Sequence, residues 1–501
     1  MIKIISLPLI AGALMVFSYL EIKYVNDIFH SVQPLKIEKA SSIVTNEKEL
    51  LQAIEKVAPG DVIVLMDGEY KDVKLSLSTK SSKEYPIIIK AKNSGKVTVV
   101  GNFHWKISGD YITVSGIHFT KGSRHKDNDL IVDTGEYNTY QHCKFDFLND
   151  VSGTYIKLEG RKSVVEYCEF TGKTTLASYI NMDVPKEEGS HHIIRRNYFS
   201  RPPLKKNGGS AMRVGHGSMA MFHAYILIEE NLFENCDGES EIVSVKSSRN
   251  YIRNNTFRTS KGAFSLRQGN GSVFEGNFFI GDGQKECGGL TIRGRDHFVF
   301  NNYFYNLKAR KSGVINFGVA SPEDPERVKR GIYPRHFPLT QDIVLCYNTI
   351  AENKSDSHIN FLEGYGTRDR FGLPTNINFY NNIFDGTANV VNGKPNMKVT
   401  FASNFTSQSE ANINGITSVK LNKLKVDGIV VPEIKSLDRT SVVDVPQQIN
   451  YSVFNNRDLL IEKDIFGRAR EKIKNAGCFN FTNTDDEIKR PLFKKDVGCG
   501  Y

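Results

Sequence analysis

The sequence predicts an all-β fold, a right-handed parallel β-helix (a solenoid) with an N-terminal capping helix. The first observation is a motif that recurs through the middle of the chain: asparagine, one variable residue, then an aromatic or aliphatic residue. It begins at Asn197, Asn231, Asn255, Asn277, Asn302, Asn348 and Asn382. The second is its spacing, because the phenylalanines that mark successive repeats from Phe119 to Phe304 lie 22 to 34 residues apart. Such a period, with β-branched and aromatic runs between Gly, Asn and Asp turns, is typical of a solenoid of short strands.

The recurring asparagines have a structural explanation in this fold. Equivalent residues of successive coils in a parallel β-helix stack about 4.8 Å apart. We therefore expect the asparagines to form an inward ladder at a turn, with their amides bonded to the coils above and below, and we assign them no catalytic role. A leucine-rich repeat has a similar period, but the sequence lacks its leucine ladder.

The segment 46–70 predicts the capping helix and the first strand. Leu50, Leu51 and Ile54 follow helical periodicity, Pro59 ends the helix, and the run "VIVLM" after it is typical of a strand. A helix here would shield the open end of the solenoid. We expect three regions: 1–30 as a signal peptide or signal anchor, 31–395 as the β-helix domain with the candidate site, and 396–501 as the last irregular coils and a tail.

The N-terminus indicates export. Residues 4–20, "IISLPLIAGALMVFSYL", form an apolar run of 17 residues after one lysine. This length fits the apolar region of a secretory signal and is at the short limit for a membrane span. We expect a periplasmic or secreted protein, with residues 4–20 either removed or kept as a membrane anchor. A stable membrane partner is expected only in the second case.

Charge and cysteine content bound the function further. Lysine and arginine number 65 against 56 aspartates and glutamates, a net charge of +9 that no single basic run carries. A diffuse positive field suits a polyanionic partner. Seven cysteines scattered over 501 residues are not a disulfide framework, and we expect most of them to be buried thiols.

The stretch "GESEIVSVKS" places Glu239, Glu241 and Lys246 inside an apolar strand. On a regular strand the two glutamates share one face with their Cβ atoms about 6.5–7 Å apart, so both carboxylates can bind one hard cation such as Ca²⁺. Lys246 has the opposite parity and joins them only if the chain bends between them, as at a corner of a β-helix. The alternative is a surface strand whose three charges are simply solvated.

The neighbouring coils add polar residues at the same place. One coil earlier, "RPPLKKNGGSAMRVG" contains Asn207 and Arg213. One coil later, "GAFSLRQGNGSVFEGNFF" contains Arg267 in an apolar strand. Stacking brings the three coils side by side, which favours a site over a solvated strand.

These segments resemble the alginate lyase and chondroitinase B group of polysaccharide lyases, family 6. The matching stretches are "YPIIIKAKNSGKVTVVGN", "ITVSGIHFTKG", "RPPLKKNGGSAMRVG", "CDGESEIVSVKS", "LRQGN" and "GGLTIRGRDHFVFNNYF". They cover about residues 45–305, and "DIFGRAR" and "RPLFKKDVG" extend the resemblance weakly into the C-terminal third. The resemblance implies a catalytic base at Lys246, an acid at Arg267, calcium ligands at Asn207, Glu239 and Glu241, and a substrate-carboxylate contact at Arg213.

The implied reaction is Ca²⁺-assisted β-elimination at a uronic acid. The cation would neutralise the sugar carboxylate, Lys246 would remove the C5 proton, and Arg267 would assist the departing O4. A glycosidase instead needs two carboxylates across the scissile bond. Here the glutamates lie side by side with a lysine nearby, which favours elimination.

The stretches "RPPLKKNGG" and "CDGESEI" resemble the alginate-cleaving members, so the expected partner is an acidic polysaccharide, alginate (a polymer of mannuronate and guluronate), and not a nucleic acid. Two alternatives stay open: a dermatan sulfate or chondroitin B lyase with the same mechanism, and a non-catalytic β-helix that binds polysaccharide. Three residues depart from the family pattern. Gln268, Ser210 and Thr291 stand where the family usually has histidine, glutamate and arginine.

Overall fold

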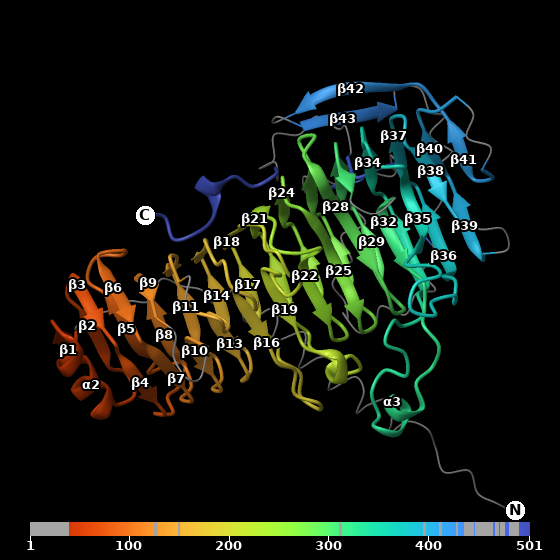
Figure 1. Ribbon diagram of the computed structural model, residues 1–501. Helices are drawn as coiled ribbons and strands as arrows, with labels where there is room; N and C mark the ends of the chain where they lie inside the picture. Colours follow the sequence, from red (N-terminus) through yellow and green to blue (C-terminus); the bar gives the residue numbers. More distant parts are fainter. Residues whose placement is uncertain are drawn as a thin grey trace, which may run out of the picture.

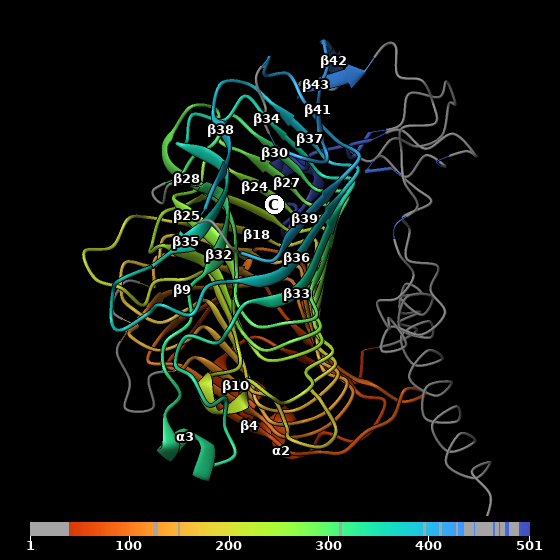
Figure 2. The same cartoon turned by 90° about the vertical axis from the view of Figure 1, so that its right-hand side faces the viewer.

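The computed structural model describes residues 40–123, 129–148, 151–309, 313–393, 397–409, 413–426, 429–434, 445, 464–465, 470, 476–479 and 490–501. Its chain winds into a parallel β-helix built from three long sheets, which confirms the predicted fold (Figure 1). Figure 2 views the solenoid from one end and shows the sheets enclosing a common interior.

Each coil contributes one strand to each sheet over most of the length. In the described residues, sheet 1 has 14 strands from β1 (Ser42–Val44) to β39 (Val399–Ala402), and sheet 3 has 14 from β3 (Gly68–Lys71) to β41 (Ile416–Ser418). Sheet 2 has 13, from β4 (Lys74–Leu77) to β38 (Asn389–Asn392), with β31 (Lys308–Ala309) paired at one side. Its central strands are β16 (Ile180–Met182), β19 (Met212–Val214), β22 (Glu241–Lys246), β25 (Gly262–Gln268), β28 (Lys285–Ile292), β32 (Gly313–Gly318) and β35 (Ser357–Glu363).

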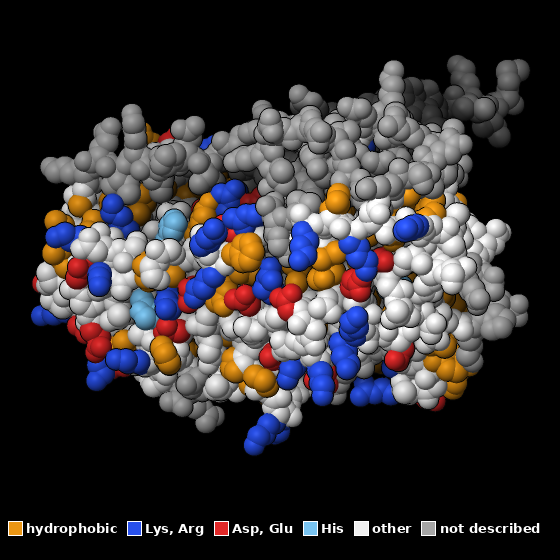
Figure 3. Space-filling view, turned by 90° about the horizontal axis from the view of Figure 1, so that it is seen from above, with side chains coloured by type: hydrophobic (Ala, Val, Ile, Leu, Met, Phe, Trp, Pro, Cys, Tyr) orange, Lys and Arg blue, Asp and Glu red, His pale blue; other side chains and the backbone are white. Residues whose placement is uncertain are grey.

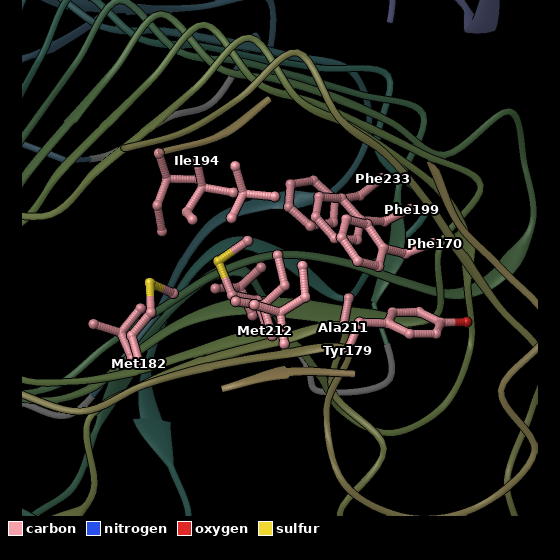
Figure 4. Packing of buried hydrophobic residues seen from close by; sticks show 14 of the residues in the cluster. Phe170, Tyr179, Met182, Ile194, Phe199, Ala211, Met212 and Phe233 are labelled. Carbon is pink, nitrogen blue, oxygen red and sulfur yellow. The ribbon is translucent and has the colours of Figure 1, made fainter. Parts of the chain in front are cut away.

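The interior is filled by stacked side chains from all three sheets. Phe170, Phe199 and Phe233 of sheet 3 lie with their ring centroids 5.1 and 4.8 Å apart, nearly parallel (Figure 4). Ile194 from sheet 1 and Met212 from sheet 2 face them across the coil, and all five are buried. Burial of such apolar stacks is the main stabilising contribution to a solenoid of short strands.

The asparagine ladder is present as expected. The backbone N–H and the side-chain Nδ2 of Asn255 both donate to Oδ1 of Asn277, each at 3.0 Å. Asn277 donates in the same way to Asn302, at 2.9 and 3.0 Å. The series runs from Asn197 through Asn231, Asn255, Asn277, Asn302, Asn348 and Asn382 to Asn404. Each amide thus satisfies buried backbone groups at the turn between sheets 1 and 3.

The N-terminal cap is helix α2 (Glu47–Glu55), whose first turn is capped by the side chain of Asn46, 3.0 Å from the N–H of Glu49. Leu50 and Ile54 are buried against the first coil, as their periodicity predicts. None of the helices in the described ranges is long and apolar enough to cross a membrane. The expected signal segment, residues 4–20, lies outside the described residues.

The C-terminal part leaves the regular stack. Coils continue past residue 395 to β41, and then β42 (Leu421–Val426) and β43 (Ile429–Ile434) form an antiparallel hairpin. Residues 490–501 run back along sheet 3, where the N–H of Leu492 donates to Thr256 and the hydroxyl of Tyr501 donates to the carbonyl of His142. All seven cysteines are buried and unpaired.

Candidate active site

The expected site residues lie on the outer face and at the ends of the central strands of sheet 2. In register, Arg213 pairs with Ser244, Ser244 with Ser265, and Ser265 with Thr291. The residues flanking this row point into the apolar core. Because side chains alternate along a strand, the row itself faces away from the core.

Two β-bulges lie where β22 pairs with β25, next to the expected site residues. Glu241 pairs with Ala263 whereas Val243 pairs with Phe264, so Ile242 is an extra residue on β22. The bulge reverses the parity of Glu241, which then faces outward together with Lys246. This is the bend that the opposite parity of the two residues requires. It lies within β22 and not at a corner of the coil.

The second bulge lies on β25. Val245 pairs with Leu266 and Lys246 pairs with Gln268, which leaves Arg267 as the extra residue. Arg267 approaches Glu241 from the neighbouring coil, with Nε 3.6 Å from Oε1. The hydroxyl of Ser265 donates to the same oxygen at 3.2 Å. The structure therefore groups a carboxylate, a lysine and an arginine on one face of two adjacent strands.

Burial and mutual charge perturb these groups. Burial lowers the pKa of Lys246, and Arg267 and Arg213 lower it further while Glu241 opposes them. Burial, followed by the charge of Arg293, lowers the pKa of Arg267 to about 10. A lowered pKa eases proton transfer by lysine or arginine near neutral pH, and both pKa values are lowered here.

Two of the three expected metal ligands, Asn207 and Glu239, line one cavity at the beginning of the same strands. The cavity has a volume of about 370 Å³, and Lys261 and Glu286 also line it. Glu239 accepts a hydrogen bond from the N–H of Gly208 at 2.7 Å. Burial raises the pKa of Glu239, and the charge of Glu241 raises it further.

These observations fit a hard cation. Two carboxylates that repel each other in a partly buried place are stabilised by a divalent ion, and carboxylate and amide oxygens are the ligands that Ca²⁺ prefers. Among the described residues no three His, Cys, Asp or Glu side chains form a metal cluster, so a cation here would also need Asn207 or backbone oxygens. Glu241 is not among the residues that line the cavity and would complete the site from its edge.

The loop with Asn207 is held by a buried arginine. Arg201 is fully buried, and its guanidinium donates to the carbonyls of Ser210 at 2.9 Å and Thr175 at 2.6 Å. The hydroxyl of Ser210, one of the three departures, lies 2.8 Å from that of Ser178. This position is occupied by a small buried hydroxyl that ties two coils together.

The other two residues that depart from the family pattern, Thr291 and Gln268, are both buried. Thr291 is buried in the row between Ser265 and Asn316, on the outer side of sheet 2. Gln268 is buried and donates from Nε2 to the backbone carbonyl of His336 at 3.2 Å. Its side chain therefore anchors a later loop and is not free to contact a ligand in this conformation.

Several residues near Arg267 were not expected from the sequence. Arg293 and Arg370 both pair with Glu363, and the ring of Phe337 lies against the guanidinium groups of all three arginines. These residues come from the end of sheet 2 and from loops 319–340 and 364–372. The signal that could have found them is the repeat spacing, which lengthens to 46 residues between Asn302 and Asn348 and so marks an insertion.

The surface charge agrees with a diffuse positive field. Figure 3 shows lysine and arginine side chains interspersed with acidic ones over the face seen from above. Arg213 is exposed on β19, one coil before the lysine. It pairs in register with Ser244, two residues before Lys246, so it lies beside the same site.

Comparison with known proteins agrees with this fold. The family model described as chondroitinase B matches residues 44–455. No curated protein sequence matches the chain. Among solved structures, the PL6 family alginate lyase AlyGC has a TM-score of 0.72 and 24% identity, covering 89% of this chain and 60% of that one. The chain thus spans about 60% of the length of AlyGC.

Two further structures match over nearly their whole length. A mannuronic acid specific family 6 lyase from human gut microbiota has a TM-score of 0.66 and 24% identity, covering 77% of this chain and 92% of that one. The PL6 polysaccharide lyase Pedsa3628 from Pseudopedobacter saltans has a TM-score of 0.69 and 22% identity, covering 92% and 100%. These likenesses establish the shared fold, and the match of the family model to most of the sequence shows that the chain belongs to the chondroitinase B family, polysaccharide lyase family 6.

Proposed function

We propose that this protein is a polysaccharide lyase that cleaves a uronic-acid-containing polyanion, most specifically alginate, by Ca²⁺-assisted β-elimination. The observation that carries the proposal is the arrangement on β22 and β25: a bulge turns Glu241 to the outer face that Lys246 shares, and Arg267 of the adjacent strand pairs with Glu241. A strand that merely bound polyanions would need neither the acidic residues nor the two irregularities in register.

The reaction requires a base for a weakly acidic proton. Lys246 removes the C5 proton of the uronate, the C5–H electron pair forms the C4–C5 double bond, and the C4–O4 bond breaks. Burial and two neighbouring arginines favour the neutral amine of Lys246, which is the form that accepts a proton. Arg213, exposed on the preceding strand, would bind a substrate carboxylate.

The departing oxygen needs a proton or a strong hydrogen-bond donor. Arg267 is the group on the adjacent strand that can supply either, because its pKa lies at about 10 and its guanidinium keeps donors not used by Glu241. The product carries a 4,5-unsaturated uronate at its new non-reducing end.

Asn207, Glu239 and Glu241 would hold the calcium ion. When bound, it neutralises the C5 carboxylate and stabilises the negative charge that develops there. The partly buried Glu239 lines the cavity and accepts a hydrogen bond from the N–H of Gly208. Arg201 fixes the loop with Asn207 from below.

Alginate is supported by the matching solved structures, one described as an alginate lyase and one as mannuronic acid specific. Dermatan sulfate is the second candidate, because the family model bears the name chondroitinase B. Both polymers would use the same residues, so the substrate must be decided by assay.

The test is the ultraviolet absorbance of the conjugated product on alginate and, in parallel, on dermatan sulfate. Lys246→Ala and removal of calcium by a chelator should each abolish the signal, and added Ca²⁺ should restore it in the chelated enzyme. Lys106→Ala is the matched control, since Lys106 is an exposed lysine of the same sheet several coils away. Activity on dermatan sulfate alone would change the substrate, and no activity on either polymer would favour a binding protein.

A further inference from the structure

The loop 319–340, between β32 and β33 (Gln341–Cys346), lies at the end of sheet 2 and carries helix α3 (Pro325–Lys329) (Figure 1). It is tied to the solenoid by several hydrogen bonds. Tyr333 donates to the side chain of Asn270 at 3.1 Å, and the hydroxyl of Thr340 donates to the carbonyl of Ile292 on β28 at 3.3 Å. The loop therefore has a defined position relative to the β-helix.

Phe337 is the residue of this loop that reaches the candidate site. Its ring centroid lies 4.3 Å from the guanidinium carbon of Arg267, and the ring is buried. The preceding residue, His336, accepts a hydrogen bond from Gln268, which is the neighbour of Arg267 on β25. Backbone and ring thus dock together on the bulged end of that strand.

The same ring is in contact with three like charges. Arg370 lies 4.3 Å and Arg293 5.6 Å from its centroid, and both arginines pair with Glu363. The Nη1 group of Arg267 is buried and has no hydrogen-bond acceptor. The negative face of an aromatic ring attracts a guanidinium, most strongly where water is excluded.

We infer that Phe337 is a positioning residue: its ring holds the guanidinium of Arg267 against Glu241 and toward the departing oxygen, apart from Arg293 and Arg370. This inference rests on the proposed function, since it gives Arg267 a role in the reaction. Without the ring, Arg267 would keep its charge and its bond to Glu241 but would lose the surface that fixes its orientation. A purely structural Phe337 would fill space equally well as a methionine or leucine.

The experiment compares Phe337→Met and Phe337→Leu, which remove the aromatic face, with Phe337→Tyr, which keeps it. Phe371→Leu is the matched control, because Phe371 is exposed on the adjacent loop. We expect Phe337→Met and Phe337→Leu to lower kcat about tenfold with KM within about twofold, the size of a partly desolvated cation–π contact. Phe337→Tyr should stay near the wild-type kcat. Equal kcat values for Phe337→Met and Phe371→Leu would overturn the inference.

A second readout does not depend on activity. In protein labelled with ¹⁵N-arginine, a guanidinium over an aromatic face has an upfield-shifted Nε–H proton, and Arg267→Lys identifies the signal. The shift should be lost in Phe337→Met and kept in Phe337→Tyr. An enzyme without lyase activity but with this pattern would refute the proposed function and leave the contact established. An unshifted Arg267 signal in the wild type would refute the contact itself.

Discussion

The role of Arg267 can be tested by separating proton supply from general stabilisation of the site. With a pKa of about 10, Arg267 is more than about 99% protonated at pH 7.5 and is available as a donor. General acid catalysis typically contributes about 10²–10⁴-fold in rate, which is about 3–5.5 kcal/mol of barrier. We therefore expect Arg267→Ala to lower kcat on a natural oligouronate by that factor.

The assay uses two substrates that differ in the leaving group. In a synthetic uronide with an acidic phenol at O4, the phenolate leaves without protonation. Arg267→Ala should therefore slow the cleavage of this substrate only a few-fold. Lys246→Ala should slow both substrates alike, because the C5 proton must be removed in each. Arg295→Ala is the control, since Arg295 is half exposed near the same strand ends. Equal losses on both substrates in Arg267→Ala would refute the assignment of Arg267 to the departing oxygen.

Three further predictions concern the metal, the ladder and a buried lysine. Ca²⁺ should raise the melting temperature, and Glu239→Gln should remove most of that increase in a thermal-shift titration; an unchanged increase would move the site elsewhere. Asn277→Leu should lower the free energy of unfolding by about 2–4 kcal/mol in denaturant, because it leaves buried partners in two coils unpaired; a loss below about 0.5 kcal/mol would contradict the ladder's contribution. Burial lowers the pKa of Lys173 to about 7. Between about pH 7 and 10 this lysine is therefore protonated in the unfolded chain and neutral in the folded protein. The free energy of unfolding, compared with that of Lys173→Met, should rise over this range by up to about 1.4 kcal/mol per pH unit. A difference that does not change over this range would show that Lys173 is protonated in the folded protein.

The regular part of the fold was predictable because it follows from repetition. The asparagine before each aromatic residue and the spacing of the phenylalanines predict the stacked coils, and the hydrogen bonds from Asn255 to Asn277 and the ring stacks confirm them. The buried positions Leu50 and Ile54 of the capping helix follow from helical periodicity. Each of these features depends on local sequence and on identical neighbours one coil away.

The sequence predicts that Glu241 and Lys246 lie together only if the chain bends between them. Strand parity shows that a bend is needed, but no residue in "GESEIVSVKS" marks where it lies. The bulge at Ile242 depends on how β22 pairs with β25, a contact between coils that the sequence of one strand does not specify. The motifs thus predict which residues form the candidate site, whereas their arrangement follows only from how the strands pair.

The division between coils and insertions explains which parts of the site the sequence revealed. The proposed base, its carboxylate neighbour and the expected metal ligands stand on consecutive coils, so stacking predicts that they lie near one another. The surroundings of Arg267 come from two later insertions, and Phe337 lies 70 positions beyond Arg267 in the chain. Repetition cannot predict such contacts, because an insertion has no equivalent in the neighbouring coil. A solenoid can therefore keep the strand of the proposed base while its loops change the environment of Arg267, the group proposed to serve the leaving oxygen. We expect substrate preference in this protein to depend on loop 319–340 more than on β22.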